Sequence, residues 1–339
     1  MIRKKFARAD AVLQTACGER FTAAVARVEA GGALLFERAY GVTRLDDGAQ
    51  PVYVDTPFDL ASLTKLFVAF LVQLASREGA VDLDEPLPAW FPEWGRLPHR
   101  AITLRMLLSH TSGMASGADY RELLGSDVVE FALRRELAAS PGERVIYSDL
   151  GFITLGEWLQ RFKGASLASL MKAHTSARFR PPSPQRLPAT EDDGWRGRVQ
   201  GVVHDEKAYL LGGAGGHAGL FGTAADVAKL TESYLGALHG RPTPLAQTDA
   251  REAIAEQAYD PILRRGLGWA LKTSDENSCG RRFGSRTFGH TGFVGTCVWA
   301  DPDRDCSGVL LTNAVYFGRN DILDLRAAFY DALIEDLEG

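Results

Sequence analysis

Apolar, β-rich runs of residues predict β-structure at both ends of the chain. Four segments have this pattern, and they are residues 21–29, 33–40, 286–300 and 307–313. Ala30-Gly31-Gly32 separates the first two segments, as in a hairpin. Asp321 to Leu337 has the apolar spacing of an amphipathic helix. Strands at both termini imply one sheet to which both ends of the chain contribute.

The middle of the chain has a helical pattern instead. A buried, apolar helix is predicted from Ser62 to about Gly79. Residues 81–230 show little β pattern and predict an all-helical lobe, with residues 178–200 as a proline-containing loop. The fold class is therefore α/β (α+β). We expect residues 1–80 and 231–339 to form the sheet region, and the lobe to complete a single catalytic domain.

Composition excludes several function classes. The 339 residues are 45% hydrophobic and 24% charged, as in ordinary globular proteins. The net charge of −5 gives no basic footprint for nucleic acid. No apolar run approaches the ~20 residues that a membrane span needs.

The N-terminus and the cysteines bear on the compartment. Met1–Lys5 is basic like the start of a signal peptide, but Arg8 and Asp10 interrupt the stretch that should be apolar. The four cysteines have no metal spacing and predict reduced core residues. We therefore expect a cytoplasmic protein, or a periplasmic one if an export signal has been removed. No histidine or carboxylate pair has a metal-ligand spacing, so neither a metal nor a cofactor is expected.

Ser62 and Lys65 are the first candidates for chemistry. Their separation of three residues places them on one helix face. A lysine whose pKa is lowered by burial can deprotonate a serine hydroxyl, and a helix N-terminus favours a developing oxyanion. The same pair also fits a helix cap beside a surface lysine. Motifs further along the chain decide between the two interpretations.

Two such motifs follow in order. Tyr147-Ser148-Asp149 precedes a predicted helix, and His290-Thr291-Gly292 lies on a predicted strand. With Ser62-Leu63-Thr64-Lys65, they resemble the class C-like branch of the serine β-lactamase and penicillin-binding protein superfamily. That branch includes class C β-lactamases, D-alanyl-D-alanine carboxypeptidases, D-aminopeptidases and carboxylesterases. Leu107–Met114 and Gly219–Asp226 also resemble it, and the similarity runs from about residue 20 to the C-terminus. It implies a β-lactamase/transpeptidase-like fold with an antiparallel sheet.

The resemblance implies catalytic roles. Ser62 matches the acylated nucleophile, and Lys65 matches the amine that helps to deprotonate it. Tyr147 matches the phenol that passes a proton to the leaving group. The backbone N–H groups of Ser62 and Phe293 match the oxyanion hole.

Two motif positions depart from the common pattern. Asp149 stands where asparagine is usual, and an ionised carboxylate cannot donate a hydrogen bond to substrate. It can instead pair with Lys65 and keep that lysine protonated. His290 stands where lysine is usual, so a permanent cation is lost from this strand. By the resemblance, Thr291 and Gly292 on the same strand match the edge along which the family's substrates lie.

The remaining histidines are weaker candidates. The sequence leaves open whether His204 lines the cleft or lies in a surface loop. His217 is expected in a turn and His110 in a structural hydrogen bond. Three further histidines are expected at the surface, namely His99, His174 and His239. Gly213–Ala218 fits G-x-G-x-x-A, but no strand precedes it and a dinucleotide site is not expected.

These observations predict a serine hydrolase. It would form an acyl-enzyme from an amide or ester of a small D-amino-acid peptide or acyl substrate. Its partners would be small molecules or short peptides, with β-lactams among the candidates. Two alternatives stay open: a promiscuous carboxylesterase, and a penicillin-binding sensor that is occupied without turnover.

Overall fold

One antiparallel sheet of seven strands forms the centre of the molecule. The computed structural model describes residues 6–262 and 264–339, so the basic segment Met1–Lys5 lies outside the described residues. The strand order is β2-β1-β12-β11-β10-β9-β8. The strands are β1 (Ala23–Ala30), β2 (Ala33–Gly41), β8 (Arg264–Arg265), β9 (Ala270–Leu271), β10 (Phe288–Thr291), β11 (Cys297–Asp301) and β12 (Cys306–Thr312).

The two ends of the chain meet in this sheet, as the sequence predicted. β1 pairs with β12, with Val25 opposite Leu311. Alternate residues point to opposite faces of a strand. Val25 and Leu311 belong to one hydrophobic core, and Ala24 and Leu310 belong to a second core on the other face. Both faces are therefore buried, so these strands are more continuously apolar than a strand with one wet face.

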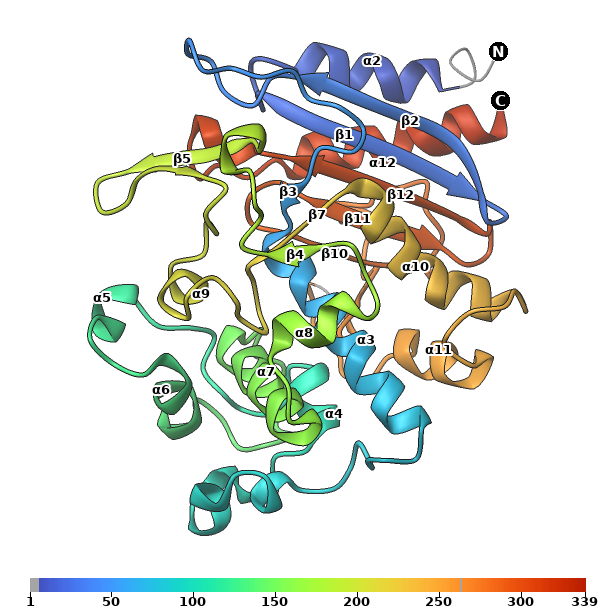
Figure 1. The fold of residues 1–339 in the computed structure, drawn as a ribbon. Helices are drawn as coiled ribbons and strands as arrows, with labels where there is room; N and C mark the ends of the chain where they lie inside the picture. The colour runs from blue at the N-terminus through green and yellow to red at the C-terminus, as the bar shows by residue number, and fades with distance from the viewer. Residues whose placement is uncertain (1–5, 263) are drawn as a thin grey trace.

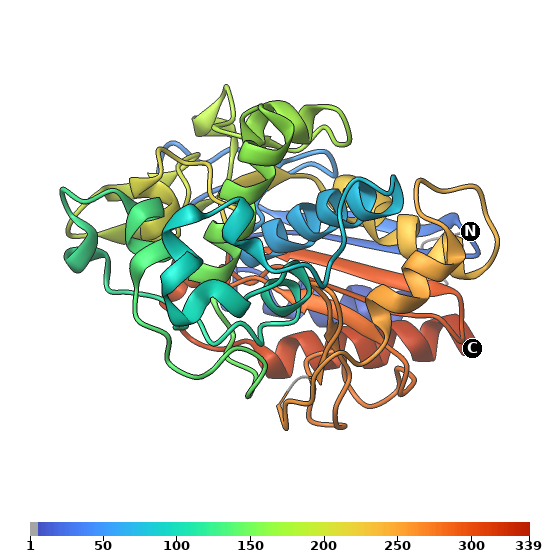
Figure 2. The ribbon, with the colours of Figure 1, turned by 90° about the horizontal axis from the view of Figure 1, so that it is seen from below.

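Helices cover both faces of the sheet. α2 (Ala7–Ala16) and α12 (Leu323–Glu338) lie on one face, and α3 (Thr64–Arg77), α10 (Ala224–Leu238) and α11 (Gln247–Ile254) lie toward the other (Figures 1 and 2). α3 is buried on almost every side, which its nearly uniform apolar sequence requires. It runs between the sheet and the lobe, so its N-terminus reaches the boundary between them (Figure 1).

The inserted lobe is mostly but not wholly helical. Its helices are α4 (Leu104–Leu108), α5 (Tyr120–Leu123), α6 (Val128–Arg134), α7 (Asp149–Lys163), α8 (Leu167–Lys172) and α9 (Glu206–Leu210). The prediction of a loop over residues 178–200 was wrong, because this stretch holds β4 (Arg178–Phe179) and the hairpin β5–β6 (Ala189–Asp193 and Gly197–Gln200). A small sheet of β3 (Phe58–Asp59), β7 (Leu220–Gly222) and β4 also joins the lobe to the segment before α3.

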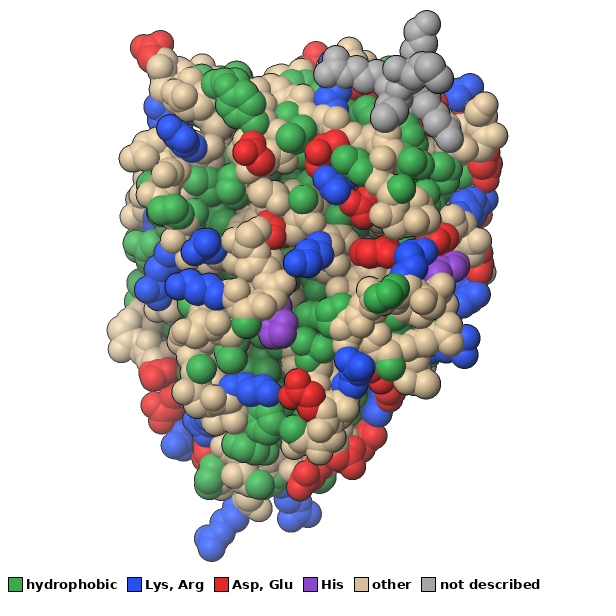
Figure 3. All heavy atoms as spheres, turned by 45° about the vertical axis from the view of Figure 1, so that its right-hand side comes forward, with side chains coloured by type: hydrophobic (Ala, Val, Ile, Leu, Met, Phe, Trp, Pro, Cys, Tyr) green, Lys and Arg blue, Asp and Glu red, His purple; other side chains and the backbone are tan. Residues whose placement is uncertain are grey.

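Among the described residues, no helix is long and apolar enough to cross a bilayer. Basic and acidic side chains are interspersed on the face seen in Figure 3, which matches the small negative net charge.

Candidate active site

A strained turn presents Ser62 at the head of α3. Ser62 lies in a 3-10 helix (Ala61–Leu63) that leads into α3. Ala61 has a positive φ of 46°, a conformation that non-glycine residues seldom adopt and that often marks a functional site. The Asp59 carboxylate accepts a hydrogen bond from the Ala61 N–H at 2.8 Å, and the Thr296 hydroxyl donates to the Leu60 carbonyl at 3.2 Å. These contacts hold the turn against its strain.

Lys65 is fully buried one turn beyond Ser62. Its Nζ lies 2.9 Å from Ser62 Oγ, 2.9 Å from Asp149 Oδ1 and 3.2 Å from the His217 carbonyl oxygen. An ammonium group has three protons, and here it has three acceptors. Burial, the largest single influence, lowers the pKa of Lys65, but the Asp149 charge and Tyr147 together outweigh it, so the pKa is raised above its ordinary value. The ion pair that the sequence predicted is present, and Lys65 is protonated at rest.

Tyr147 and its neighbours are fixed by the loop before α7. The Lys65 ammonium lies 4.9 Å from the centre of the Tyr147 ring. The next residue, Ser148, caps α7 by accepting from the Gly151 N–H at 2.9 Å. His110 Nδ1 accepts from the Ser148 N–H at 3.0 Å, which confirms the structural role expected for His110. Tyr147 is therefore held beside Lys65 by a capped helix and a buried imidazole.

His290 reaches the site from β10 as a neutral ring. It is only 3% exposed, and Nδ1 lies 2.8 Å from the Thr291 carbonyl oxygen. Because a carbonyl only accepts, the proton is on Nδ1 and Nε2 is left as an acceptor. Burial, reinforced by Lys65 and Arg265, lowers the pKa of His290 to about 3. Near pH 7 this histidine supplies no positive charge.

A cavity of about 410 Å³ opens above Ser62. Ser62, Tyr147, His290, Thr291, Gly292 and Phe293 all line it. Gly292 allows a close approach, since a Cβ there would lie 2.1 Å from Thr296 Oγ1. Phe293 lies beyond the last β10–β11 pair and is 58% exposed at the cavity. The structure thus brings together six of the nine candidate residues around one hollow.

His204 and Asp149 do not line this cavity. His204 is 2% exposed, stacks against the Phe293 ring with centroids 5.5 Å apart, and has Nε2 3.2 Å from Glu191. His204 therefore packs behind Phe293, neither on the cavity wall nor in an exposed surface loop. The Asp149 oxygens face two lysines rather than substrate: Oδ1 pairs with Lys65 and Oδ2 lies 3.3 Å from Lys207 Nζ.

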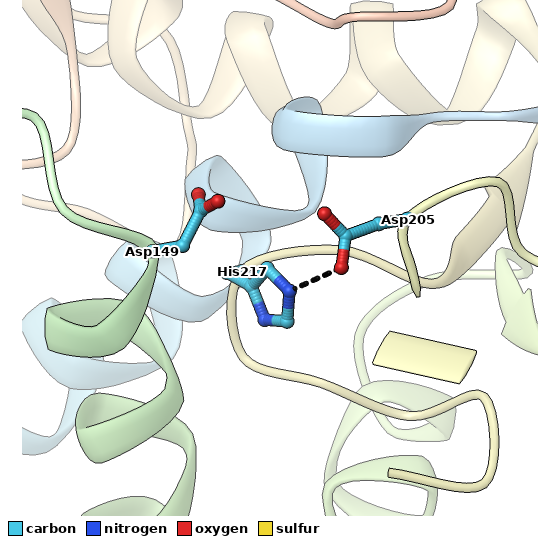
Figure 4. Close-up of side chains that lie close together, drawn as sticks. All are labelled: Asp149, Asp205 and His217. Carbon is cyan, nitrogen blue, oxygen red and sulfur yellow. Dashed lines mark hydrogen bonds and ion pairs between the residues drawn. The ribbon is translucent and has the colours of Figure 1, made fainter. Parts of the chain in front are cut away.

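Three potential metal ligands converge beside Lys65. Asp149, Asp205 and His217 place one ligand atom each within 4.8 Å of one another, although nothing in their sequence spacing indicates it (Figure 4). His217 Nε2 lies 2.8 Å from Asp205 Oδ1, and Lys207 Nζ lies 3.1 Å from Asp205 Oδ2. Each carboxylate oxygen in this group therefore already has a nitrogen partner. The positive charges that a metal would supply come here from lysine ammonium groups.

The chain matches the beta-lactamase family over residues 8–332. The chain belongs to that family. It is 30% identical to esterase EstB of Burkholderia gladioli, over 96% of this chain and 95% of that protein. It is 28% identical to a putative D-alanyl-D-alanine carboxypeptidase of Escherichia coli strain K12, over 83% of this chain and 75% of the relative.

The fold agrees with this membership. The solved structure of EstCE1, described as a hydrolase with promiscuous acyltransferase activity, superposes with a TM-score of 0.77. The two chains are 22% identical, and the match covers 96% of this chain and 99% of the other. The β-lactamase/transpeptidase-like fold predicted from the motifs is confirmed, and the chain is a hydrolase of the beta-lactamase family.

Sequence reasoning missed four residues around the site. Asp205 and Lys207 follow closely after His204, which was the residue considered in this part of the chain. His217 is fully buried and paired with Asp205 rather than a simple turn residue. Arg265 lines the cavity from β8. A run of charged residues, His204-Asp205-Glu206-Lys207, was the one available signal for the first two.

Proposed function

We propose that this chain hydrolyses an ester or amide of a small acyl or D-amino-acid substrate through an acyl-enzyme on Ser62. The observation that carries the proposal is the contact of 2.9 Å between Ser62 Oγ and the buried Lys65 Nζ at the floor of a cavity. A serine hydroxyl needs a nearby base and fixed donors to act as a nucleophile. Tyr147 beside it and the backbone N–H groups of Ser62 and Phe293 complete that set.

Because Lys65 is protonated at rest, it does not take the Ser62 proton directly. Ser62 attacks the substrate carbonyl once Lys65 and Tyr147 together have lost one proton, which makes room for the hydroxyl proton. The oxygen of the tetrahedral intermediate lies between the two backbone N–H groups. Tyr147 then delivers the proton to the leaving group, and water repeats the sequence to release the acid.

The names of two relatives suggest an ester or a short peptide as the substrate. EstB and the putative carboxypeptidase carry names of both kinds. Asp149 favours an ester over a β-lactam in this proposal, since a carboxylate cannot donate to an acylamide carbonyl. The neutral His290 points the same way, because it offers no cation to a β-lactam carboxylate.

A substrate panel tests the proposal. p-Nitrophenyl esters, D-amino-acid amides, D-alanyl-D-alanine peptides and nitrocefin are assayed with wild type and Ser62→Ala. We expect turnover of esters or D-amino-acid substrates that depends on Ser62, and weak nitrocefin hydrolysis. A stable penicilloyl adduct with no turnover of any substrate would instead support a penicillin-binding sensor.

We also propose that the protein works in the cytoplasm. Cys17, Cys279, Cys297 and Cys306 are all free thiols, as suits a reducing compartment. Fractionation of cells that express the native gene should recover the protein with cytoplasmic markers, and recovery in a periplasmic fraction would contradict this.

A further inference from the structure

Five ionisable side chains form a closed ring of contacts behind the proposed nucleophile. Lys65 contacts Asp149, Asp149 contacts Lys207, Lys207 contacts Asp205, and Asp205 contacts the His217 ring. The ring closes because the His217 carbonyl accepts from Lys65 at 3.2 Å. Figure 4 shows the two carboxylates and the imidazole of this ring pointing toward one another.

Lys207 is the member of the ring that lies between the two carboxylates. Its Nζ is 3.3 Å from Asp149 Oδ2 and 3.1 Å from Asp205 Oδ2, and its side chain is 12% exposed. Asp205 caps α9 by accepting a hydrogen bond from the Ala208 N–H at 2.8 Å. The helix that carries Lys207 is therefore fixed by one of the two carboxylates that Lys207 contacts. The position of Lys207 is thus set by the fold rather than by a flexible surface contact.

The ring divides the charge of Asp149 between two ammonium groups. One oxygen faces Lys65 and the other faces Lys207. Because Lys207 partly neutralises the Asp149 carboxylate, that carboxylate stabilises the Lys65 ammonium less. The Lys207 ammonium also repels the Lys65 ammonium directly. Both effects ease the loss of a proton from Lys65.

We infer that Lys207 is a positioning residue that tunes how readily Lys65 gives up its proton, acting through the shared Asp149 carboxylate. This inference rests on the proposed function, because the proton on Lys65 matters only if Ser62 is the nucleophile. Lys207 lies behind Asp149 and need not touch the substrate for this role.

Several other ionisable groups face Lys65, and two of them are histidines that stay neutral near pH 7. Tyr147 and Asp149 face Lys65 from the start of α7. Others face it from several packed elements: Asp205 and Lys207 from α9, His217 from the loop before β7, His290 from β10, His110 from the end of α4 and Arg265 from β8. Burial holds the pKa of His110 well below its ordinary value and that of His290 at about 3, so both rings are neutral near pH 7.

The test is the pH dependence of Ser62 reactivity in Lys207→Met. The probe is a fluorophosphonate, whose attachment to Ser62 is followed by intact mass, together with the kcat/KM–pH profile on a p-nitrophenyl ester. Loss of Lys207 leaves Asp149 wholly to Lys65, so the acid limb of both profiles should move up by about one pH unit. Lys207→Arg keeps the charge and should stay close to wild type. Lys172→Met, at an exposed lysine on α8, is the matched control and should not move the limb.

The outcomes separate the inference from the proposed function. An unshifted acid limb in Lys207→Met overturns the inference while leaving the proposed function in place, even if the variant melts at a lower temperature. Should Lys207→Met not fold, Lys207→Gln is measured instead and must show the same upward shift. A wild-type chain that neither turns over esters nor forms the adduct overturns the proposed function, and the inference falls with it.

A double variant checks the route through Asp149. In an Asp149→Asn background the shared carboxylate is gone, so replacing Lys207 by Met should move the acid limb less than it does in the wild-type background. Equal shifts in both backgrounds would show that Lys207 acts without Asp149 and would overturn this route.

Discussion

Asp149→Asn is the substitution that tests most closely how the proposed mechanism is controlled. It replaces a carboxylate by an amide of nearly the same size, so packing around the start of α7 should change little. The contacts that change are the ion pair of 2.9 Å with Lys65, whose side chain has no solvent exposure, and the contact of 3.3 Å with Lys207 Nζ. The variant therefore removes the negative charge that these two lysines share.

The expected shift follows from that geometry. Two unit charges 2.9 Å apart interact by roughly 6 kcal/mol at an effective dielectric constant of about 20, which is an upper limit. Burial of Lys65 opposes this attraction, and Lys207 takes part of the Asp149 charge. Charge pairs at hydrogen-bond distance typically move a pKa by ~1–3 units, and the sharing favours the lower half of that range.

The assay is the kcat/KM–pH profile on a p-nitrophenyl ester, with nitrocefin measured in parallel. Without the carboxylate, the pKa of Lys65 falls, so a proton is lost at lower pH and the acid limb should move down by ~1–2 pH units. The new amide is no longer held by the two ammonium charges, so it can turn toward the cavity and donate to an acylamide carbonyl, and the ratio of nitrocefin to ester hydrolysis should rise. An unshifted limb with an unchanged ratio would refute the reasoning. The acid limb should move down in Asp149→Asn and up in Lys207→Met. A general loss of stability would not produce shifts in opposite directions.

Two further predictions address the rest of the cavity. The pKa of His290 is about 3 in the folded chain, against an ordinary value of 6.5. Between these two pH values the His290 ring binds a proton only in the unfolded chain, so the free energy of unfolding falls as the pH is lowered. His290→Asn should therefore reduce the slope of unfolding free energy against pH by up to ~1.4 kcal/mol per pH unit near pH 5, as measured by urea denaturation; an unchanged slope would contradict the buried neutral ring. Phe293 is 58% exposed at the cavity, so Phe293→Ala should raise KM for aryl esters roughly fivefold while leaving the melting temperature near that of wild type. An unchanged KM would show that the Phe293 ring does not contact the substrate.

The sheet and the central helix were predictable because burial imposes a simple pattern on them. β1 and β12 contribute residues to a hydrophobic core on each face, and α3 is apolar on nearly all sides, so their sequences carry the signal. The hairpin β5–β6 was not predictable from pattern, since Ala-Thr-Glu-Asp-Asp has low β propensity and is held by its local partner and surroundings. His99 was expected at the surface but is buried, with Nε2 3.1 Å from the Arg135 carbonyl.

The candidate site also contains some residues that the sequence could predict and others that it could not. Ser62 and Lys65 are close in sequence, so helical geometry alone places them together. The ring through Asp205, Lys207 and His217 depends on four segments that meet only in the folded chain, and no spacing rule joins them. Residues that act through tertiary contacts with a motif are therefore the ones that sequence reasoning misses.

The proposed acyl-enzyme mechanism depends most on Ser62 being the acylated residue. The direct measurement is mass spectrometry of enzyme quenched during turnover of a p-nitrophenyl ester, followed by mapping of the acyl group to a peptide. We predict an adduct of one acyl group on the peptide that contains Ser62, and no adduct and less than about a hundredth of wild-type activity for Ser62→Ala. An acyl group on any other residue, or a Ser62→Ala variant that keeps most of its activity, would contradict the account.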